Sequence, residues 1–233
     1  MHHRHICVAL FGGKGERFHA PFPKQFIDLD GEPMILVTLK ALSLCGAIDD
    51  IYVVSEVNSI EQVYNLLQDA GIPKIKDILP GGKTRQSSSL SALEHLKKTG
   101  VKDDAIVMIV DGDRPCIDES IIARSYDAAE KDGAAVVVAP VTDSILLSKD
   151  GKQVSEYIDR STVYAVQTPQ TFRFSIIYEA AKRFQSQLVT DDASLVKLLG
   201  KPVALVVGKK DNIKITVPED IEAYISWKKR TKA

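Results

Sequence analysis

The chain has 233 residues, of which 45% are hydrophobic and 26% charged, and this is the composition of an ordinary globular enzyme. Its formal net charge of −1 excludes a broad electrostatic attraction to nucleic acid or to an anionic membrane. No apolar run reaches about 18 residues, so the sequence predicts no membrane-spanning helix. Because no repeat or linker divides it, we expect residues 1–233 to form a single domain.

Short runs of branched aliphatic residues alternate along the chain with segments of helical period. The predicted strands are Ile6–Leu10, Ile51–Ser55, Ile106–Val110, Ala134–Ala139 and Ala204–Val207. The predicted helices are Met34–Leu44, Ile60–Ala70, Ser88–Lys98, Glu119–Asp132, Arg173–Ser186 and Ala193–Leu199. This alternation predicts an α/β fold, in which a mostly parallel sheet carries helices on both faces and ligands bind beyond the carboxyl ends of the strands.

The first predicted strand leads into a glycine-rich loop, Phe11–Arg17, which is followed by Pro23–Gln25. Its glycines let backbone N–H groups approach a triphosphate closely, and they are Gly12, Gly13 and Gly15. Arg17 and Lys24 add two cations suited to the charge on transferring phosphoryl oxygens. The loop lacks the Gly-Lys-Ser/Thr of a Walker A motif and the third glycine of a dinucleotide fingerprint. A tight turn alone would explain the glycines, but the two cations favour phosphate binding.

A second glycine-rich segment, Gly81–Ser89, opens the third predicted helix. Its hydroxyl groups can form an N-cap cluster, which alone explains at least one serine. A cap needs neither the glycines nor Arg85, which favour instead a backbone-lined slot for a nucleotide base. The segment by itself leaves both interpretations open.

Two carboxylates, Asp111 and Asp113, follow the third predicted strand. Side chains two residues apart can face the same way on an extended chain. Hard cations such as Mg²⁺ take few protein carboxylates and complete their shell with phosphate oxygens. Asp111, at the edge of the strand, is therefore a predicted metal ligand. Asp113 either joins it or pairs with Arg114 or another cation at the turn.

The segment Val141–Arg160 interrupts the alternation with two short β-like pieces around a predicted turn at Asp150-Gly151. Its residues are too mixed in polarity to form a good core element. It is either an exposed hairpin or an arm that packs on a second subunit.

Polar residues late in the chain admit two interpretations each. Thr190 can be a helix N-cap, with Asp191 and Asp192 placed favourably for the helix dipole. Lys214, between Ile213 and Ile215, is either solvated on an edge strand or a clamp for an anionic substrate.

The cysteines Cys7, Cys45 and Cys116 are widely spaced and odd in number. Cys7 lies in a predicted strand and Cys45 near a predicted helix end, so we expect buried free thiols in a reducing compartment. The amino-terminal residues lack the apolar core of a signal peptide. These features favour a cytoplasmic protein.

Taken in order, these segments resemble the 2-C-methyl-D-erythritol 4-phosphate cytidylyltransferase family and its relatives, the ribitol-5-phosphate cytidylyltransferases. The resemblance covers nearly the whole chain through the motifs Gly-x-Gly-x-Arg, Pro-Lys-Gln, Gly-Gly-x-x-Arg-x-x-Ser, Asp-x-x-Arg-Pro, Thr-Pro-Gln, Thr-Asp-Asp-Ala-Ser and Asn-Ile-Lys-Ile-Thr. It implies a Rossmann-like nucleotidyltransferase fold with a protruding β-arm at about residues 141–160 and a homodimer that exchanges this arm. It also implies the use of CTP, a polyol phosphate acceptor, and Mg²⁺ or another divalent cation.

The resemblance assigns roles to individual residues. The implied catalytic residues are Arg17, Lys24, Arg160 and Lys214. The implied nucleotide-binding residues are Gly12, Gly13, Gly15, Gly82, Lys83, Ser88 and Gly112. The implied substrate-binding residues are Asp111, Ser144, Arg160, Thr168 and Thr190, with Asp111 also the metal ligand. Arg160 would be held out by the arm toward the neighbouring active site.

The chain also departs from the family pattern, which commonly reads His-Asp-Ala-Ala-Arg-Pro where this sequence has Val110–Pro115. Gly112 removes a methyl group near the expected ribose, and Asp113 adds a charge close to the metal. Phe11-Gly12-Gly13 is similar to the ribitol relatives, whereas Thr190–Ser194 and Asn212–Thr216 are similar to the methylerythritol branch.

The longer carboxy-terminal matches favour transfer of CMP from CTP to 2-C-methyl-D-erythritol 4-phosphate, a step of isoprenoid precursor synthesis. The products would be the CDP-alcohol and pyrophosphate. One alternative is a ribitol-5-phosphate or other pentitol-phosphate cytidylyltransferase that supplies surface polymers. Another is a nucleotide-binding regulatory domain without catalysis, although binding alone would not need so many charged residues.

Overall fold

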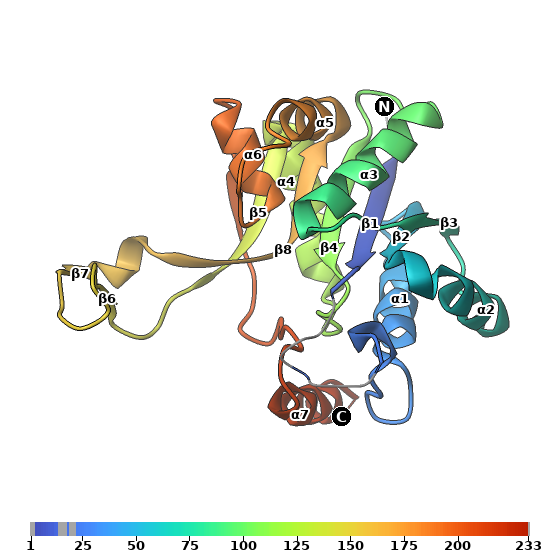
Figure 1. The fold of residues 1–233 in the computed structure, drawn as a ribbon, viewed down its shortest axis with the longest axis horizontal. Helices are drawn as coiled ribbons and strands as arrows, with labels where there is room; N and C mark the ends of the chain where they lie inside the picture. The colour runs from blue at the N-terminus through green and yellow to red at the C-terminus, as the bar shows by residue number, and fades with distance from the viewer. Residues whose placement is uncertain (1–2, 14–17, 19–21, 233) are drawn as a thin grey trace.

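The computed structural model describes residues 3–13, 18 and 22–232. A twisted seven-stranded sheet forms its centre, with strand order β3-β2-β1-β4-β8-β5-β9 (Figure 1). The strands are β1 (His5–Phe11), β2 (Asp50–Ser55), β3 (Ile75–Pro80), β4 (Ile106–Asp111), β5 (Ala134–Pro140), β8 (Tyr164–Arg173) and β9 (Ala204–Val207). Only β8 runs antiparallel to its neighbours, β4 and β5. The predicted α/β fold with a mostly parallel sheet is confirmed.

Helices cover both faces of this sheet. They are α1 (Met34–Leu44), α2 (Ile60–Ala70), α3 (Arg85–Lys98), α4 (Glu119–Asp132), α5 (Phe174–Arg183), α6 (Asp192–Leu198) and α7 (Glu219–Lys232). One core cluster joins α3, α5 and α6 to the side chains of Ile6 and Val8 in β1. A second cluster joins α1, α2 and α4 to Cys7 and Ala9, which alternate with Ile6 and Val8 along β1. The continuous burial of β1 therefore follows from a helical layer on each side.

The helix α7 belongs to neither layer. Its residues Tyr224 and Trp227 pack in a third, smaller cluster with Met34, Cys116 and Ile215. Figure 1 shows α7 apart from the other helices, beyond the ends of the central strands. The carboxy-terminal helix is thus anchored beside the segment that carries Lys214.

Capping residues explain where several helices begin and end. Asp118 caps α4 by accepting hydrogen bonds from the backbone N–H groups of Ser120 and Ile121, and Gly133 ends the helix with a φ of 84°. The expected cluster of capping hydroxyls before α3 is confirmed, with Thr84 as the N-cap and Ser87 as its partner in a capping box. Asp191, not Thr190, caps α6 by accepting from the backbone N–H of Ser194.

Three elements were not predicted from the sequence, namely β3, β8 and α7. The strand β3 lies at the edge of the sheet and is largely exposed, so it has no continuous apolar run. The strand β8 contains Pro169, which normally argues against a strand. The helix α5 starts one residue later than predicted, because Arg173 is the last residue of β8 and not the first of the helix.

The predicted hairpin is confirmed as β6 (Ile145–Leu147) paired with β7 (Glu156–Ile158). At its turn, Asp150 accepts hydrogen bonds from the backbone N–H groups of Lys152 and Gln153, and Gly151 has a φ of 68°. Figure 1 shows this arm, residues 141–163, extending away from the sheet. In the part of the chain that the structure describes, no helix has the length and hydropathy to cross a membrane.

Candidate active site

A cleft of about 1050 Å³ lies at the carboxyl ends of the parallel strands. Loops after β1, β2 and β3 supply one side of it, and the end of β4 with residues 214 and 216 supplies the other. Its lining residues are Leu10, Gly12, Gly13, Lys24, Glu56, Val57, Asn58, Gly81, Gly82, Lys83, Thr84, Arg85, Ser88, Asp111, Asp113, Lys214 and Thr216. This is the edge at which open α/β sheets bind ligands. The structure therefore brings described residues of both glycine-rich loops together with Lys24, Asp111 and Lys214.

Two lysines and two carboxylates meet inside this cleft. Lys24, the first residue of a short 3₁₀ helix, places its Nζ 2.6 Å from Oδ2 of Asp113. The Nζ of Lys214 lies 2.9 Å from Oδ2 of Asp111 and 3.9 Å from Oδ1 of Asp113. Asp113 thus pairs with neighbouring cations, one of the two roles expected for it, although its partner is not Arg114. Lys214 thus pairs with carboxylates in the cleft instead of lying solvated on an edge strand.

Arg85 extends the pairing on the other side of Asp111. As the first residue of α3 it reaches Oδ1 of Asp111 at 2.9 Å and Oδ2 of Asp192 at 2.6 Å. Burial opposes ionisation of Asp111, but Arg85 and Lys214 outweigh it and lower its pKa to about 2. Burial raises the pKa of Asp192, and Arg85 only partly compensates. We call these six groups the ion-pair chain: Lys24, Asp113, Lys214, Asp111, Arg85 and Asp192.

The loop before α3 is shaped by its own hydrogen bonds. Ser88 accepts a hydrogen bond from the backbone N–H of Gly82 and donates one to the carbonyl of Thr84. A Cβ atom at Gly82 would lie 2.2 Å from the hydroxyl oxygen of Ser87, so only glycine fits there. The segment is therefore both a helix cap and one wall of the cleft, with Lys83 exposed along it.

Gly112 does not leave open space, in contrast to the expectation that it removes a methyl group near a ribose. A Cβ atom at this position would lie 2.3 Å from ring carbons of Phe11. The carbonyl of Gly112 also accepts a hydrogen bond from the hydroxyl of Thr38. The phenyl ring thus occupies the volume that an alanine would need, and Phe11 and Gly112 are sterically matched.

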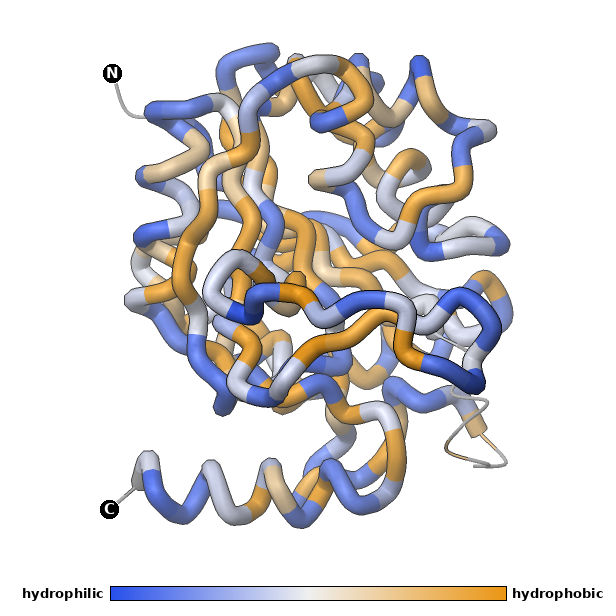
Figure 2. Tube along the Cα trace, turned by 90° about the vertical axis from the view of Figure 1, so that its left-hand side faces the viewer, coloured by the Kyte–Doolittle hydropathy of each residue, from blue (hydrophilic) through white to orange (hydrophobic). Residues whose placement is uncertain are grey.

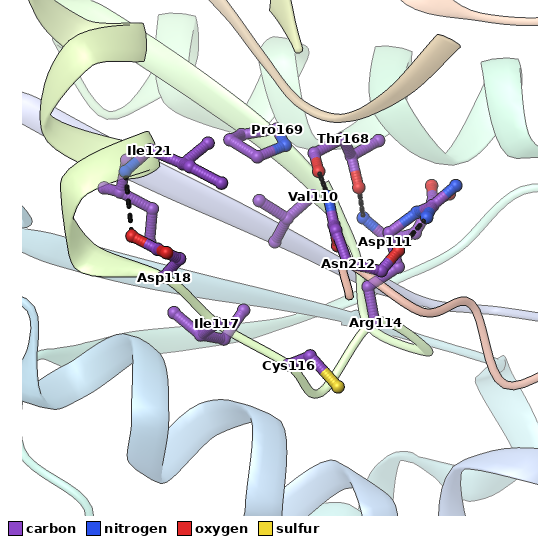
Figure 3. A pocket seen from close by; sticks show the side chains of 11 residues that line it. Val110, Asp111, Arg114, Cys116, Ile117, Asp118, Ile121, Thr168, Pro169 and Asn212 are labelled. Atoms are coloured by element: carbon purple, nitrogen blue, oxygen red, sulfur yellow. Dashed lines mark hydrogen bonds and ion pairs between the residues drawn. The ribbon is translucent and has the colours of Figure 1, made fainter. Parts of the chain in front are cut away.

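Behind Asp111, a network of hydrogen bonds ties three segments together (Figure 3). Thr168 accepts from the backbone N–H of Asp111 at 3.1 Å, and Asn212 donates to the carbonyl of Thr168 at 2.8 Å. Arg114 donates to the carbonyl of Asn212 at 2.7 Å. A cavity of about 20 Å³ lies among these residues and has room for a single water molecule. Thr168 therefore supports Asp111 from behind instead of lining the cleft.

Other predicted site residues lie elsewhere. Ser144 and Arg160 are exposed on the arm, where Arg160 donates to the carbonyl of Thr142. Thr190 is exposed before α6, with its hydroxyl 3.3 Å from a carboxylate oxygen of Asp191. None of the three lines the cleft of its own chain in the described residues. Gly15 and Arg17 lie outside the described residues.

The sequence did not predict the parts that several residues play in the site. Asp192 was expected only to favour the dipole of a helix, Asn212 stood only within a matching motif, and Arg85 was expected only to favour a slot for a base. The cleft residues Glu56, Val57 and Asn58 follow β2, whose position beside β1 is the one signal that could have located them.

A mostly parallel sheet with glycine-rich loops and paired cations and carboxylates at its carboxyl edge is the arrangement of a nucleotide-binding α/β enzyme. Residues 6–225 match the family model for 2-C-methyl-D-erythritol 4-phosphate cytidylyltransferase (IspD). The chain belongs to this family.

Curated relatives and solved structures agree with that assignment. The enzyme of this name from Lachnospira eligens is 36% identical, covering 93% of this chain and 95% of its own. The one from Thermosipho melanesiensis is 38% identical, covering 93% and 94%. The crystal structure of 4-diphosphocytidyl-2C-methyl-D-erythritol synthase from Anaerococcus prevotii has a TM-score of 0.83 at 25% identity, covering 97% and 96%.

The steric match of Phe11 and Gly112 predicts non-additive stability. Gly112→Ala alone should lower the free energy of unfolding by about 1–3 kcal/mol, because the new methyl overlaps the ring. In Phe11→Ala/Gly112→Ala the overlap is gone, so the double variant should be more stable than the sum of the single changes predicts. Urea unfolding of the variants measures this. Gly13→Ala, whose added Cβ would meet nothing within 4 Å, is the control, and additive losses would contradict the match.

Proposed function

We propose that this chain transfers CMP from CTP to 2-C-methyl-D-erythritol 4-phosphate, releasing pyrophosphate and a CDP-alcohol used for isoprenoid precursors. The observation that carries the proposal is the ion-pair chain, which places Lys24 beside Asp113 and Lys214 beside Asp111 in a cleft lined by two glycine-rich loops. Membership of the cytidylyltransferase family supports the same reaction. The relatives favour the methylerythritol acceptor over ribitol 5-phosphate.

The reaction is an in-line attack by a phosphate oxygen of the acceptor on the α-phosphorus of CTP. A phosphomonoester is largely ionised near neutral pH, because its second pKa is about 6, so no general base is needed. The rate then depends on positioning and on neutralising the negative charge that builds up. Lys24 and Lys214, both lining the cleft, are placed for this role, and Arg17 is assigned to it by its motif.

The glycine-rich loops are assigned to the nucleotide. Gly12 and Gly13 line the cleft where β1 ends and present backbone to the phosphates. Gly82, Lys83 and Ser88 line the neighbouring loop and are assigned to the cytosine base. The two loops lie next to each other, because a Cβ atom at Gly12 would lie 3.6 Å from the hydroxyl oxygen of Ser88.

Mg²⁺ or another divalent cation is proposed as cofactor, with Asp111 as its protein ligand. No group of three or more His, Cys, Asp or Glu side chains in the described residues could hold a metal by itself. A site completed by phosphate oxygens fits that donor set, because Mg²⁺ usually binds through one or two carboxylates plus substrate phosphates. Asp113 adds a buried Oδ1 that has no hydrogen-bond partner among the described residues. When bound, the cation would neutralise triphosphate charge.

We also propose a homodimer in which each arm completes the partner's cleft. Figure 2, with the arm toward the viewer, shows hydrophobic and hydrophilic residues interspersed along it. Large apolar side chains are exposed there, including Leu147 at 50% and Tyr157 at 70%, and a second copy would cover them. In that dimer, Ser144 and Arg160 would reach the neighbouring acceptor site. A cytoplasmic location is proposed because Cys7, Cys45 and Cys116 are buried free thiols.

A panel of phosphorylated polyols with CTP tests the acceptor. Pyrophosphate release should be fastest with 2-C-methyl-D-erythritol 4-phosphate. A strong preference for ribitol 5-phosphate would overturn the assigned acceptor. CTP binding without pyrophosphate release for every polyol would overturn the enzymatic function itself.

Removing either assigned cation should slow the chemical step. Lys24→Ala and Arg17→Ala are each expected to lose at least about a hundredfold in turnover, because less charge is neutralised at the α-phosphorus. Pyrophosphate release under saturating substrates measures the loss. Lys97→Ala, which removes a lysine from an exposed pair with Asp103, is the matched control. Near-normal turnover in a folded Lys24 or Arg17 variant would refute the role of that residue.

Mixing two inactive variants tests whether the arm acts across a dimer. Lys24→Ala and Arg160→Ala should each be inactive alone, but a mixed dimer would contain one site with both residues intact. Unfolded and refolded together in equal amounts, they should regain about a quarter of wild-type activity. Failure to regain activity, although mass analysis shows that mixed dimers have formed, would place Arg160 outside the partner's site.

A further inference from the structure

We propose that Asp113 is an internal counter-ion that occupies Lys24 until a nucleoside triphosphate displaces it, and that it makes nucleotide binding depend on a divalent cation. This rests on the proposed function, because it concerns how the same cleft accepts its nucleotide. It assigns a positioning role to a residue that stands where the family commonly has alanine.

The geometry of the pair supports a specific role. Lys24 Nζ and Asp113 Oδ2 are 2.6 Å apart, and their side chains are only 9% and 21% exposed. Among the described residues, Asp113 is the only ion-pair partner of Lys24. A lysine this buried is strongly disfavoured without a partner, so Asp113 stabilises its charge and holds it at the wall of the cleft.

The same contact makes Asp113 a competitor for the lysine. A carboxylate oxygen at 2.6 Å takes one of the three N–H groups of the ammonium and neutralises its charge, so a phosphate oxygen that binds Lys24 competes with Asp113. Cations and carboxylates alternate along the ion-pair chain, and Arg114 adds a further cation 3.7 Å from Oδ2 of Asp111. Asp113 is the ion-pair partner of Lys24 in the described residues, so a triphosphate gains the full charge of this lysine only when that pair opens.

Asp113 is the carboxylate that can separate at the smallest cost. Asp111 is held on both oxygens, by Arg85 on Oδ1 and by Lys214 on Oδ2. Asp113 accepts a close hydrogen bond only on Oδ2, while its buried Oδ1 has no hydrogen-bond partner in the described part of the chain. The pair of Lys24 and Asp113 is thus the weak point of the ion-pair chain.

Once separated, Asp113 cannot move far from the nucleotide. Its carbonyl accepts a hydrogen bond from the backbone N–H of Ile215 at 2.8 Å, which fixes the main chain at the cleft. The released carboxylate then faces the triphosphate, and two like charges at close range repel. A divalent cation that accompanies the nucleotide removes this repulsion. Asp113 therefore selects the metal-loaded nucleotide over the free one.

The experiment compares CTP binding by calorimetry in EDTA and in Mg²⁺, with no acceptor present. In EDTA, Asp113→Asn should bind CTP at least about tenfold more tightly than the wild type, because the competing charge is gone. Added Mg²⁺ should improve binding less in Asp113→Asn than in the wild type. Asp113→Glu, which keeps the charge, should retain the wild-type dependence on Mg²⁺, which a purely structural role would not predict.

Two further variants make the result decisive. Asp113→Ala carries the residue common in the family, so it provides a second neutral variant if Asp113→Asn does not fold. Asp103→Asn removes the same charge from an exposed pair with Lys97 and should behave as the wild type.

Equal or weaker CTP binding by the neutral variants in EDTA would overturn the counter-ion role. An unchanged effect of Mg²⁺ would overturn the link to the cation. Because no acceptor is present, these outcomes are separate from a failure of the proposed reaction, which would appear as CTP binding without pyrophosphate release for every polyol.

Discussion

The ionised carboxylate of Asp111 is the interaction on which the arrangement of the site depends. It is buried at the end of β4, where ionisation would be unfavourable without the cations on either side of it. Arg85 comes from α3 and Lys214 from the segment before α7, so one side chain joins three distant parts of the sequence. The sheet holds the carboxylate in place, and the carboxylate orders the loops around it.

The second support of the site is the hydrogen-bonded layer behind this carboxylate. The antiparallel strand β8 inserts between β4 and β5 and brings Thr168 to the backbone of Asp111. Asn212 then ties the same strand to the segment that carries Lys214. A strand that looks irregular in sequence thus aligns the end of β4 with the chain that closes the cleft.

Much of this could be predicted from the sequence, for identifiable reasons. The bounds of α1, α2 and α4 were predicted correctly from their apolar residues. Lys24 and Asp111 were identified because charged residues beside strand ends and glycine-rich loops are typical of phosphate sites, whereas Lys214 was assigned through its family motif. The pairing of Lys24 with Asp113 could not be derived, because these two residues are 89 residues apart in the chain. The contact of Phe11 with Gly112 was missed for the same reason. The phenyl ring explains why position 112 has no side chain, but the two residues meet only in the folded structure.

The position of α7 has a consequence for the evolution and engineering of this enzyme. Ile215, next to Lys214, is fully buried in the cluster that Tyr224 of α7 completes. Residues of α7, which do not line the cleft, therefore help to hold Lys214 in place. Truncating or fusing the chain at this end would disturb the cleft indirectly, although no described residue of α7 lines it.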